Sequence, residues 1–327
     1  MTDDEKKITV VVPDRIEAIR LDKYLAEQEE LDFSRSFIQQ IIADGLLFVD
    51  GRAVSKKYKL RGGENIELTI PPPPEPDLTP EDIPLDIVYE DQYLAIVNKP
   101  PGLVVHPAPG NPNHTLVNAL LYRFGRISDD ETDIRPGIVH RLDKNTSGLL
   151  IVALDDSTAR KLREQLAERK ITKIYKAVIC GHLPETEATI NLPIGRSLKD
   201  RKKMSVTNVS SREAITKYKV TERFRFLDLV DAELVTGRTH QLRVHFAHLN
   251  RPVLGDPDYG GRTKWIKGID PSLRISGREL LEIIDRQALH AQSLRFDHPV
   301  TGKEMEISSE LPEDMQKLID TLQANYR

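Results

Sequence analysis

The sequence predicts an α+β protein with a small N-terminal domain and a larger second domain. Segments with the character of β-strands are interspersed with amphipathic helical segments, which is typical of a mixed or mostly antiparallel sheet. A run of four prolines, Pro71 to Pro74, separates two independent hydrophobic patterns. The length of 327 residues, of which 39% are hydrophobic and 30% charged, suffices for one to three domains with cores of their own.

Charge, cysteine content and hydropathy exclude several classes of protein. The net charge is −4, so a polyanionic partner would require a local cluster of positive charge. Cys180 is the only cysteine, which excludes disulfides and cysteine-based zinc sites within one chain and favours a reducing compartment. No apolar run approaches membrane-spanning length, and the acidic start MTDDEKK is no signal peptide. We therefore expect a cytoplasmic protein that does not contact a membrane.

Residues 1–70 form the predicted N-terminal domain, a small α+β module. Leu21, Tyr24 and Leu25 give a first helix an apolar stripe. Ser34 is the predicted N-cap of a second helix, which ends at Gly45. The pair Asp50-Gly51 predicts a hairpin turn between strands at 46–49 and 52–54, and residues 65–70 alternate as a last strand.

A stiff extended linker is expected over residues 71–81, because consecutive prolines favour the polyproline II conformation. Residues 82–327 form the predicted second domain. Its expected strands cover residues 87–89, 94–97, 171–179, 213–221 and 227–235. Its expected helices cover residues 115–124, 156–169 and 238–249, followed by a C-terminal helix that begins near Pro312.

The segment GIVHRLDKNTSGLLIV, residues 137–152, is the centre of the second domain. Its two ends, residues 137–139 and 149–152, are apolar and are predicted to be buried strands. Between them lie His140, Arg141, Asp143 and Lys144, and Gly148 allows the chain to turn back. A loop that carries an acid and several bases between core strands can hold polar groups rigidly at the edge of a cleft. The alternative for an isolated aspartate is a solvated turn in which Asp143 caps its own backbone.

The loop resembles the signature of the RluA/RluD family of pseudouridine synthases, in which HRLD carries the catalytic aspartate and a TSG turn follows. Two further motifs of that family occur in the family's order, NKPPGLVVHP from residue 98 and TGRTHQLRVH from residue 236. The resemblance extends from about Pro84 to Pro299. It implies a curved central sheet with a cleft across it, and the isomerisation of uridine to pseudouridine in RNA. The two-domain arrangement is most similar to RluD-type enzymes, which act on large-subunit ribosomal RNA.

The resemblance also implies three catalytic residues. Asp143 would act on the ribose as a nucleophile or as a base. A carboxylate that must be ionised in a largely dry pocket needs a neighbouring cation, because burial favours the neutral form. Arg243, in RTHQLRVH, matches the family's cation, and Tyr175, in KIYKAVI, matches the tyrosine that lies against the uracil. The alternative for Tyr175 is a core aromatic residue in a strand.

Three more residues of the second domain are expected to contact the substrate. Arg141 matches the family arginine that helps to fill the space left by the extruded uridine, which offsets the cost of flipping. His140, in the same loop, is expected to contact the substrate together with Arg141. Leu289, in the sequence ALHA, is expected to form an apolar wall of the pocket, with a core leucine as the alternative.

Two clusters of positive charge are expected to bind RNA. The N-terminal domain resembles the S-four-type RNA-binding module, which presents its second helix and the following hairpin to RNA. The matching cations are Arg35, Arg52, Lys56 and Lys57. The second cluster lies in the loop RSLKDRKKM, residues 196–204, and contains Arg201, Lys202 and Lys203. Phosphate binding would depend on these local clusters, since residues 1–70 carry 11 Lys and Arg against 14 Asp and Glu. The alternative for both clusters is a charged, solvated surface.

Two other classes of function compete with this hypothesis. Several histidines could suggest a metal-dependent hydrolase, but His240 and His245 are five residues apart and would face different sides of a helix. No HExxH or carboxylate-rich metal motif occurs. A non-catalytic RNA-binding factor would have no need of Asp143, Tyr175 and Arg243 together. We expect a monomer without metal or cofactor that acts on large-subunit ribosomal RNA or an assembly intermediate of it.

Overall fold

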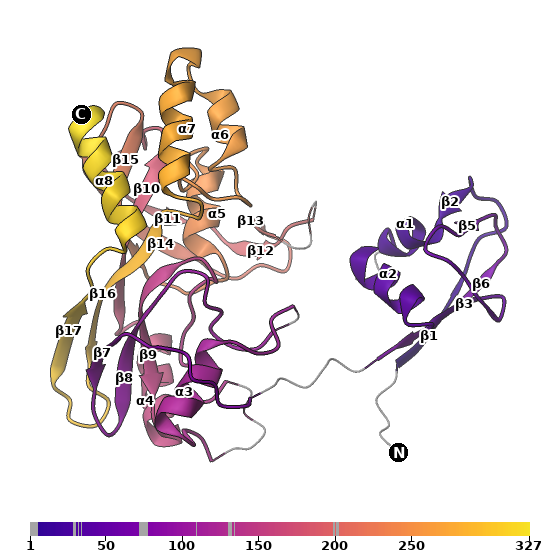
Figure 1. Ribbon diagram of the computed structural model, residues 1–327, viewed down its shortest axis with the longest axis horizontal. Helices are drawn as coiled ribbons and strands as arrows, with labels where there is room; N and C mark the ends of the chain where they lie inside the picture. The colour runs from indigo at the N-terminus through magenta and orange to yellow at the C-terminus, as the bar shows by residue number, and fades with distance from the viewer. Residues whose placement is uncertain are drawn as a thin grey trace. The chain divides into compact units, whose positions relative to one another are not determined.

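A computed structural model describes residues 6–28, 31, 33, 35–71, 78–108, 110–129, 133, 135–198, 200 and 203–327. The chain folds as two compact units, Met1–Glu75 and Pro76–Arg327, which we call unit 1 and unit 2 (Figure 1). The predicted N-cap Ser34, most of the proline linker and the predicted RNA contacts Arg201 and Lys202 lie outside the described residues. None of the helices in the described part of the chain has the length and apolar character needed to cross a bilayer.

Unit 1 is a small sheet covered by two helices. Its elements are β1 (Lys6–Val11), β2 (Ile19–Arg20), α1 (Leu21–Ala26), α2 (Arg35–Ala43), β3 (Leu47–Val49), β4 (Arg52–Ala53), β5 (Lys59–Leu60) and β6 (Asn65–Ile70). The main sheet has the strand order β1-β6-β3-β4. Leu25 of α1 and Ile38 of α2 are fully buried in its core. The predicted hairpin is confirmed: Asp50 and Gly51 both adopt positive φ angles, 48° and 73°, between the paired strands β3 and β4.

Unit 2 is built around a large mixed sheet, to which nine strands contribute within the described residues. Those strands are β7 (Ile87–Glu90), β8 (Leu94–Lys99), β9 (Ser147–Ala153), β10 (Thr172–Cys180), β11 (Glu187–Asn191), β14 (Ile215–Arg223), β15 (Leu227–Leu234), β16 (Leu289–Asp297) and β17 (Glu304–Ser308). The order is β11-β14-β15-β10-β16-β9-β8-β7, with β17 also paired to β16. Strand β9 runs parallel to β16, whereas the other pairs are antiparallel. The predicted α+β class with a mixed, mostly antiparallel sheet is confirmed.

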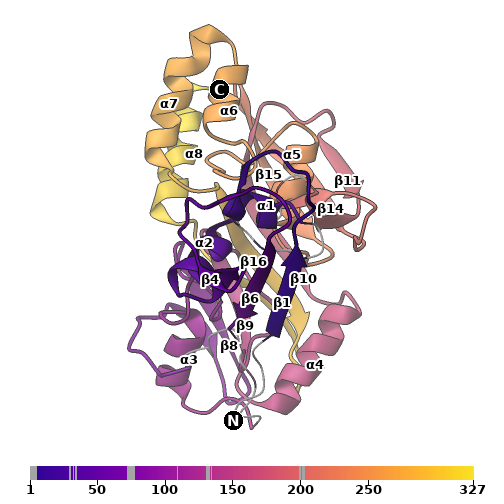
Figure 2. The same cartoon turned by 90° about the vertical axis from the view of Figure 1, so that its right-hand side faces the viewer.

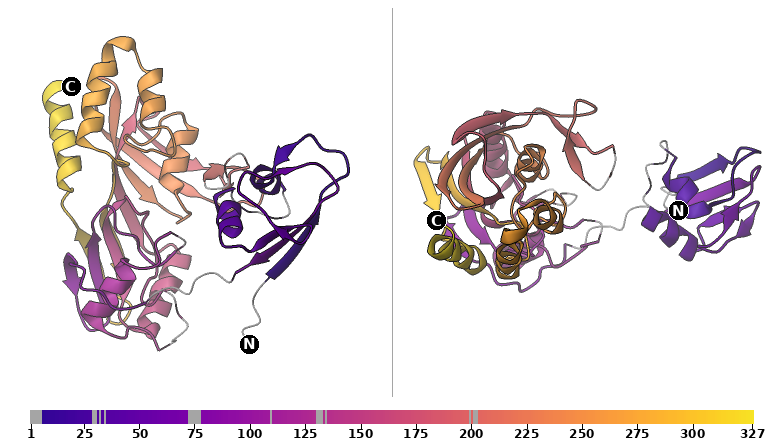
Figure 3. Two further views of the ribbon diagram at one scale, coloured as in Figure 1. Left: turned by 45° about the vertical axis from the view of Figure 1, so that its right-hand side comes forward. Right: turned by 90° about the horizontal axis from the view of Figure 1, so that it is seen from above.

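Some helices of unit 2 cover its sheet, and others gather at one end of the unit. The remaining elements are α3 (Leu116–Phe124), α4 (Asp156–Ala167), the hairpin β12 (Ile194–Arg196) and β13 (Met204–Val206), α5 (Gln241–His248), α6 (Thr263–Gly268), the 3₁₀ turn η1 (Pro271–Leu273), α7 (Arg274–Ile283) and α8 (Glu313–Asn325). Figure 2 shows α3 and α4 on opposite sides of β8 and β9. Figure 3 shows α6, α7 and α8, in orange to yellow, together at one end of the unit.

The alternation of side chains along β9 joins two cores. Leu150 and Val152 face the larger core, which contains α3 and α5, while Leu149 and Ile151 face a smaller core that contains α4. All seven residues of β9 are buried, so the strand is fixed from both faces. Gly148 is required here, because its φ angle is 113° and a Cβ atom would lie 2.3 Å from the backbone oxygen of Ala291 on β16.

The predicted strand at residues 137–139 is wrong. Ile138 makes a single isolated bridge to Val152, and the surrounding residues form a turn in which the Ile138 amide donates to the carbonyl of Arg135. Gly137 has a φ angle of 73°, and a Cβ atom there would lie 2.4 Å from the carbonyl oxygen of Ala153. The apolar side chain of Ile138 is buried as expected, but it enters the core from a turn.

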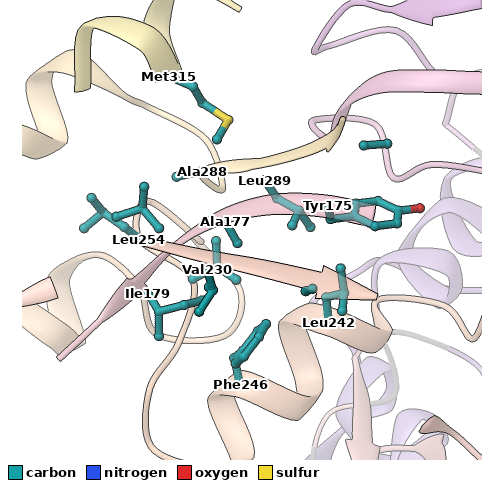
Figure 4. Packing of buried hydrophobic residues seen from close by; sticks show 14 of the residues in the cluster. Tyr175, Ala177, Ile179, Val230, Leu242, Phe246, Leu254, Ala288, Leu289 and Met315 are labelled. Atoms are coloured by element: carbon teal, nitrogen blue, oxygen red, sulfur yellow. The ribbon is translucent and has the colours of Figure 1, made fainter. Parts of the chain in front are cut away.

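The helix predicted at residues 238–249 is shorter and begins at Gln241. His240 precedes it with a left-handed backbone, φ 56° and ψ 21°, which cannot continue into a helix. In Figure 4, Leu242 and Phe246 of this helix, α5, pack below the strands that carry Tyr175, Ala177 and Val230. The packing holds α5 and its polar residues against the sheet.

Candidate active site

Asp143 lies in the loop that precedes β9, beside the buried Arg243. Its Oδ2 accepts a hydrogen bond of 3.2 Å from Nη1 of Arg243, and its Oδ1 lies 4.0 Å from Nε2 of His240. The Asp143 side chain is 18% exposed, so it is shielded but accessible. The pairing of Asp143 with Arg243, residues 100 positions apart in the sequence, is the ion pair that the loop and the RTHQLRVH motif require.

The backbone around Asp143 is held by three polar side chains from two other segments. The Lys99 ammonium donates to the carbonyl of Lys144 at 3.1 Å, and Nη1 of Arg286 donates to the carbonyl of Asn145 at 3.0 Å. The Gln287 amide donates to Oγ1 of Thr146 at 3.1 Å. Because consecutive residues after Asp143 are fixed from outside the loop, the carboxylate has a rigid base.

Lys99 is fully buried, and its ammonium also donates to the carbonyls of Pro100 and Leu103. Burial and the charge of Arg286 lower the pKa of Lys99 to about 7, while the charge of Asp143 opposes that shift. Arg286 is in turn held by Asp314 on α8, through two hydrogen bonds of 2.7 and 2.8 Å. These residues connect the Asp143 loop to β8 and to the C-terminal helix.

Two further carboxylates, besides that of Asp143, hold Arg243. Its Nε and Nη2 donate to both oxygens of Asp256 at 2.7 and 3.0 Å, and Nη2 also donates to Asp258 at 2.6 Å. Its guanidinium carbon lies 4.9 Å from the centroid of the Tyr259 ring. Burial disfavours the charged form, but these carboxylates raise the pKa of Arg243 above its ordinary value. Arg243 is therefore a permanent, fixed cation beside Asp143.

Tyr175 and Leu289 lie on adjacent strands at the edge of the same site. Tyr175 on β10 is opposite Ala232 on β15 and Ala291 on β16. Figure 4 shows its hydroxyl directed away from the hydrophobic cluster, with Leu289 next to the ring. Burial and the charge of Asp143 raise the pKa of Tyr175 well above its ordinary value, so the hydroxyl keeps its proton at neutral pH. Leu289 belongs to the core and also lines the smaller cavity, and its contact with the substrate stays a prediction.

Two adjoining cavities meet at Asp143. The smaller one, of about 40 Å³, contains Asp143, Tyr175, Arg243 and Leu289 in its lining. The larger one, of about 480 Å³, shares Asp143 and Tyr175 with it and also contains His140. Arg141 and Asp143 line both cavities, whereas Leu142 between them is buried and lines only the smaller one. Arg141 and Asp143 thus lie on the same side of an extended segment, as the sequence indicates.

His140 lines the larger cavity but is tied to β9. Its Nε2 accepts a hydrogen bond of 3.0 Å from the Ile151 amide. Burial and the charge of Lys173 lower the pKa of His140 to about 3. The neutral imidazole therefore carries its proton on Nδ1, which is the nitrogen left for a ligand.

The basic residues predicted to bind RNA differ in their surroundings. Arg52, Lys56 and Lys57 are exposed on unit 1, whereas Arg35 donates to Oδ2 of the buried Asp22 at 2.9 Å. In unit 2, the Lys203 ammonium donates to the backbone carbonyl of Asp258 at 2.7 Å. The hairpin that carries Lys203 is therefore anchored next to the carboxylates that hold Arg243.

Several residues of the site were not singled out from the sequence. Lys99 lies inside the NKPPGLVVHP motif, and Asp256 to Tyr259 follow the motif of Arg243 by a few residues. Motif membership was the available signal for Lys99. The partners of Asp256 and Arg286 depend on tertiary contacts, which spacing in the sequence does not contain.

Comparison with known proteins gives consistent similarities for both units. Residues 93–248 match the family model described as RNA pseudouridylate synthase, and residues 19–66 match the S4 domain model. A Bacillus subtilis protein named uncharacterized RNA pseudouridine synthase YlyB is 43% identical over 98% of this chain and 99% of its own length. Ribosomal large subunit pseudouridine synthase D of Escherichia coli K12 is 42% identical over 98% of this chain and 95% of its own length. The solved structure of human RNA pseudouridylate synthase domain containing 1 is 28% identical, covering 74% of this chain and 96% of that one, with a TM-score of 0.52.

Proposed function

The chain belongs to the RluA family of RNA pseudouridine synthases and carries an N-terminal S4 domain, and from this we propose that it isomerises specific uridines of large-subunit ribosomal RNA through Asp143. The observation that carries the assignment of Asp143 is its ion pair with the buried Arg243, at the junction of two cavities and beside Tyr175. Arg243 and Tyr175 complete the proposed catalytic set.

The reaction is an isomerisation, so it requires positioned acid–base groups and a nucleophile or base, with no net oxidation. The bond between ribose C1′ and uracil N1 breaks, the uracil rotates, and its C5 bonds to C1′. C5 loses a proton and N1 gains one. Asp143 acts toward the ribose as a nucleophile or as a base, while Arg243 favours its ionised form and fixes its direction. Tyr175, as a neutral phenol, can donate a hydrogen bond to the uracil during the rotation.

The target uridine must leave the RNA stack to reach Asp143. The smaller cavity, of about 40 Å³, is much smaller than the larger one, of about 480 Å³. The base must therefore enter through the larger cavity or displace the Arg141 side chain, which lines both. An arginine that leaves the pocket as the base enters can occupy the vacated position in the RNA and offset the cost of flipping. Leu289 is the proposed apolar wall against the base.

Ribosomal RNA is the proposed substrate because of the relatives and the domain organisation. The named relative from Escherichia coli is a large-subunit synthase, and the match covers nearly all of both chains. We propose residues 1–70 as the RNA-binding domain, residues 71–81 as the linker and residues 82–327 as the catalytic domain. The exposed cations Arg52, Lys56 and Lys57 would contact phosphates from the first domain, and Lys203, with Arg201 and Lys202, from the second.

The test is to treat unmodified large-subunit ribosomal RNA with the purified protein and to map pseudouridine at each position. We expect new pseudouridines at a small number of sites with the wild-type chain. Asp143→Asn should reduce their formation by at least about 10⁴-fold, as for the loss of a group that carries the chemistry. The matched control is Asp231→Asn, since Asp231 pairs with Lys176 and lines neither of the two cavities. Comparable turnover by Asp143→Asn would show that another group carries the reaction.

A further inference from the structure

Lys173 is a buried cation in the larger cavity. It lies on β10 two residues before Tyr175, so the two side chains point to the same face of the strand. The residue is 7% exposed and lines the cavity of about 480 Å³ that reaches Asp143. Within the part of the chain that the structure describes, the Lys173 ammonium has no hydrogen bond or ion pair.

The rest of this cavity is also rich in donors. Arg135, Arg141 and Arg238 line it, and Asp143 is the one carboxylate among its described lining residues. His106 lines the cavity too, is 4% exposed, and has a buried Nδ1 with no partner in the described structure. Burial and the charges of Arg135 and Arg141 lower the pKa of His106 to about 4, so it is a neutral group that can donate one hydrogen bond.

A buried ammonium without a partner is unfavourable, because desolvation is not compensated by a counter-charge. Burial lowers the pKa of Lys173 to about 8, and an anion beside it would stabilise the charged form. The lining of the cavity combines the buried, unpartnered Nδ1 of His106 with the ammonium of Lys173, a residue that is 7% exposed. A tetrahedral anion has several acceptor oxygens and can accept hydrogen bonds from more than one donor of this lining.

We propose that this cavity is a phosphate subsite that binds the phosphodiester next to the target uridine, with Lys173 as its buried anchor. The inference rests on the proposed function, since it assumes that the ribose at Asp143 belongs to an RNA strand. Each such ribose carries a phosphodiester on its 5′ and on its 3′ side, and the cavity adjoins the position of that ribose. Binding energy from this phosphate would fix the ribose relative to Asp143 before the chemistry begins.

The experiment uses the full chain and a short RNA that contains a uridine modified by the wild-type enzyme. Single-turnover rates are measured against RNA concentration for wild type, Lys173→Met and Lys219→Met. Lys219 is the matched control, because it is an exposed lysine on β14 and does not line the cavity. We expect Lys173→Met to raise the half-saturating RNA concentration roughly 30-fold, as for the loss of one partner of a desolvated charge pair. Lys219→Met should change it less than about 3-fold.

A neutral methylphosphonate at one linkage identifies the phosphate. Three RNAs are compared: unmodified, neutral on the 5′ side of the uridine, and neutral on the 3′ side. We expect one neutral linkage to weaken wild-type binding by about the same factor as Lys173→Met, and to weaken the variant little further, because both changes remove one contact. If the effects of Lys173→Met and of each linkage simply multiply, or if Lys173→Met binds normally, the subsite is refuted.

Thermal unfolding separates this role from a structural one. Replacing an unpaired buried ammonium by an apolar side chain of similar length should leave the unfolding temperature unchanged or raise it. A structural lysine would instead lower it. If Lys173→Met does not fold, the wild-type chain still decides, since equal affinity for all three RNAs overturns the proposal. Failure of the wild-type chain to modify any RNA would count against the proposed function and not against the subsite.

Discussion

Both units contain an arginine–carboxylate network, but the numbers of acids and bases are reversed. In unit 1, the fully buried Asp22 accepts hydrogen bonds from Arg20 and Arg35, whose side chains are 38% and 49% exposed. In unit 2, the buried Arg243 donates to Asp143, Asp256 and Asp258. Two bases and one acid leave a charge of +1, and one base and three acids leave −2.

The reversal assigns different tasks to the buried member of each network. The buried Asp22 holds two guanidinium groups at the surface, where their excess positive charge can meet phosphates. The buried Arg243 holds carboxylates instead: Asp256 is buried, Asp258 is about half exposed, and Asp143, which is 18% exposed, faces the cavity. In each case the buried ion is the anchor, and in our proposal a more accessible partner that it holds meets the RNA. Under this proposal, an arginine–carboxylate network serves RNA binding in one unit and chemistry in the other.

Removal of the buried base of unit 2 should have the largest effect. Arg243→Met leaves Asp143 without its cation and Asp256 buried and unpaired, so turnover should fall by about 10³-fold or more. The free energy of unfolding should also fall, by roughly 3 to 5 kcal/mol, because an uncompensated charge remains buried. Single-turnover pseudouridine formation and urea unfolding measure the two effects.

Arg243→Lys is the variant that keeps the charge and tests the geometry. A single ammonium cannot bond both oxygens of Asp256 and reach Asp143 at the same time. We expect turnover to fall about 10²-fold through misplacement of Asp143, with a smaller loss of stability than in Arg243→Met. Full activity of Arg243→Lys would mean that charge alone, without the fixed network, is enough.

The loop that carries Asp143 was predictable from sequence because its polar residues are contiguous. Arg141 and Asp143 are two residues apart in an extended segment, so their common direction follows from local geometry. The network around Arg243 in unit 2, in contrast, joins Asp143 to residues from distant segments of the chain. Asp256 and Arg286 acquire their roles only when the sheet brings β9, β10 and β16 together. Periodicity does not contain that information.

The errors in the predicted fold have the same origin. Ile138 is buried, as its apolar neighbours indicate, but a buried turn and a buried strand have the same composition over three residues. The predicted RNA contact Arg35 opens α2 as expected, yet the sequence did not show that Asp22 of α1 binds it. The contact between α1 and α2 creates that pair. Sequence patterns therefore predicted the burial of single residues better than they predicted which residues contact each other.

The exposed cations of unit 1 provide the next test of the comparison. In the triple variant Arg52→Gln, Lys56→Gln, Lys57→Gln, each lost phosphate contact should reduce the slope of log K against log salt by about 0.7 to 0.9. Three contacts would thus lower the slope by about 2 to 3. The measurement is a titration of the full chain against one ribosomal RNA fragment over a salt series.

A second triple variant serves as the control for charge alone. Lys267→Gln, Arg278→Gln and Lys317→Gln remove three exposed cations from α6, α7 and α8, away from the two cavities at Asp143. We expect this variant to keep nearly the wild-type slope. Equal slopes for both triple variants would show that the cations of unit 1 are a solvated surface and that RNA binding depends on unit 2.

The smallest expected effect is on the stability of unit 1. Asp22→Asn replaces charge-assisted hydrogen bonds by neutral ones, which should reduce local stability by about 1.5 to 3 kcal/mol at pH 7. Burial alone would raise the pKa of Asp22, but hydrogen bonds from Arg35, Arg20 and Gln39 hold it well below its ordinary value. A carboxylate with a lowered pKa in the folded state stabilises fully above the unfolded value, near about 4. That contribution is lost as the pH falls from there toward the folded value.

The difference between wild type and Asp22→Asn should therefore be constant from pH 7 to about pH 5 and shrink below about pH 4. Amide hydrogen exchange of β3 and β6 in the full chain measures this difference in the stability of unit 1. Tryptophan fluorescence would not, because Trp265, the sole tryptophan, lies in unit 2. Asp44→Asn is the control, since Asp44 is an exposed carboxylate of the same unit that accepts a hydrogen bond from the neutral side chain of Gln40. A difference that stays constant down to pH 3, or that Asp44→Asn reproduces, would show that Asp22 does not anchor the two arginines through its charge.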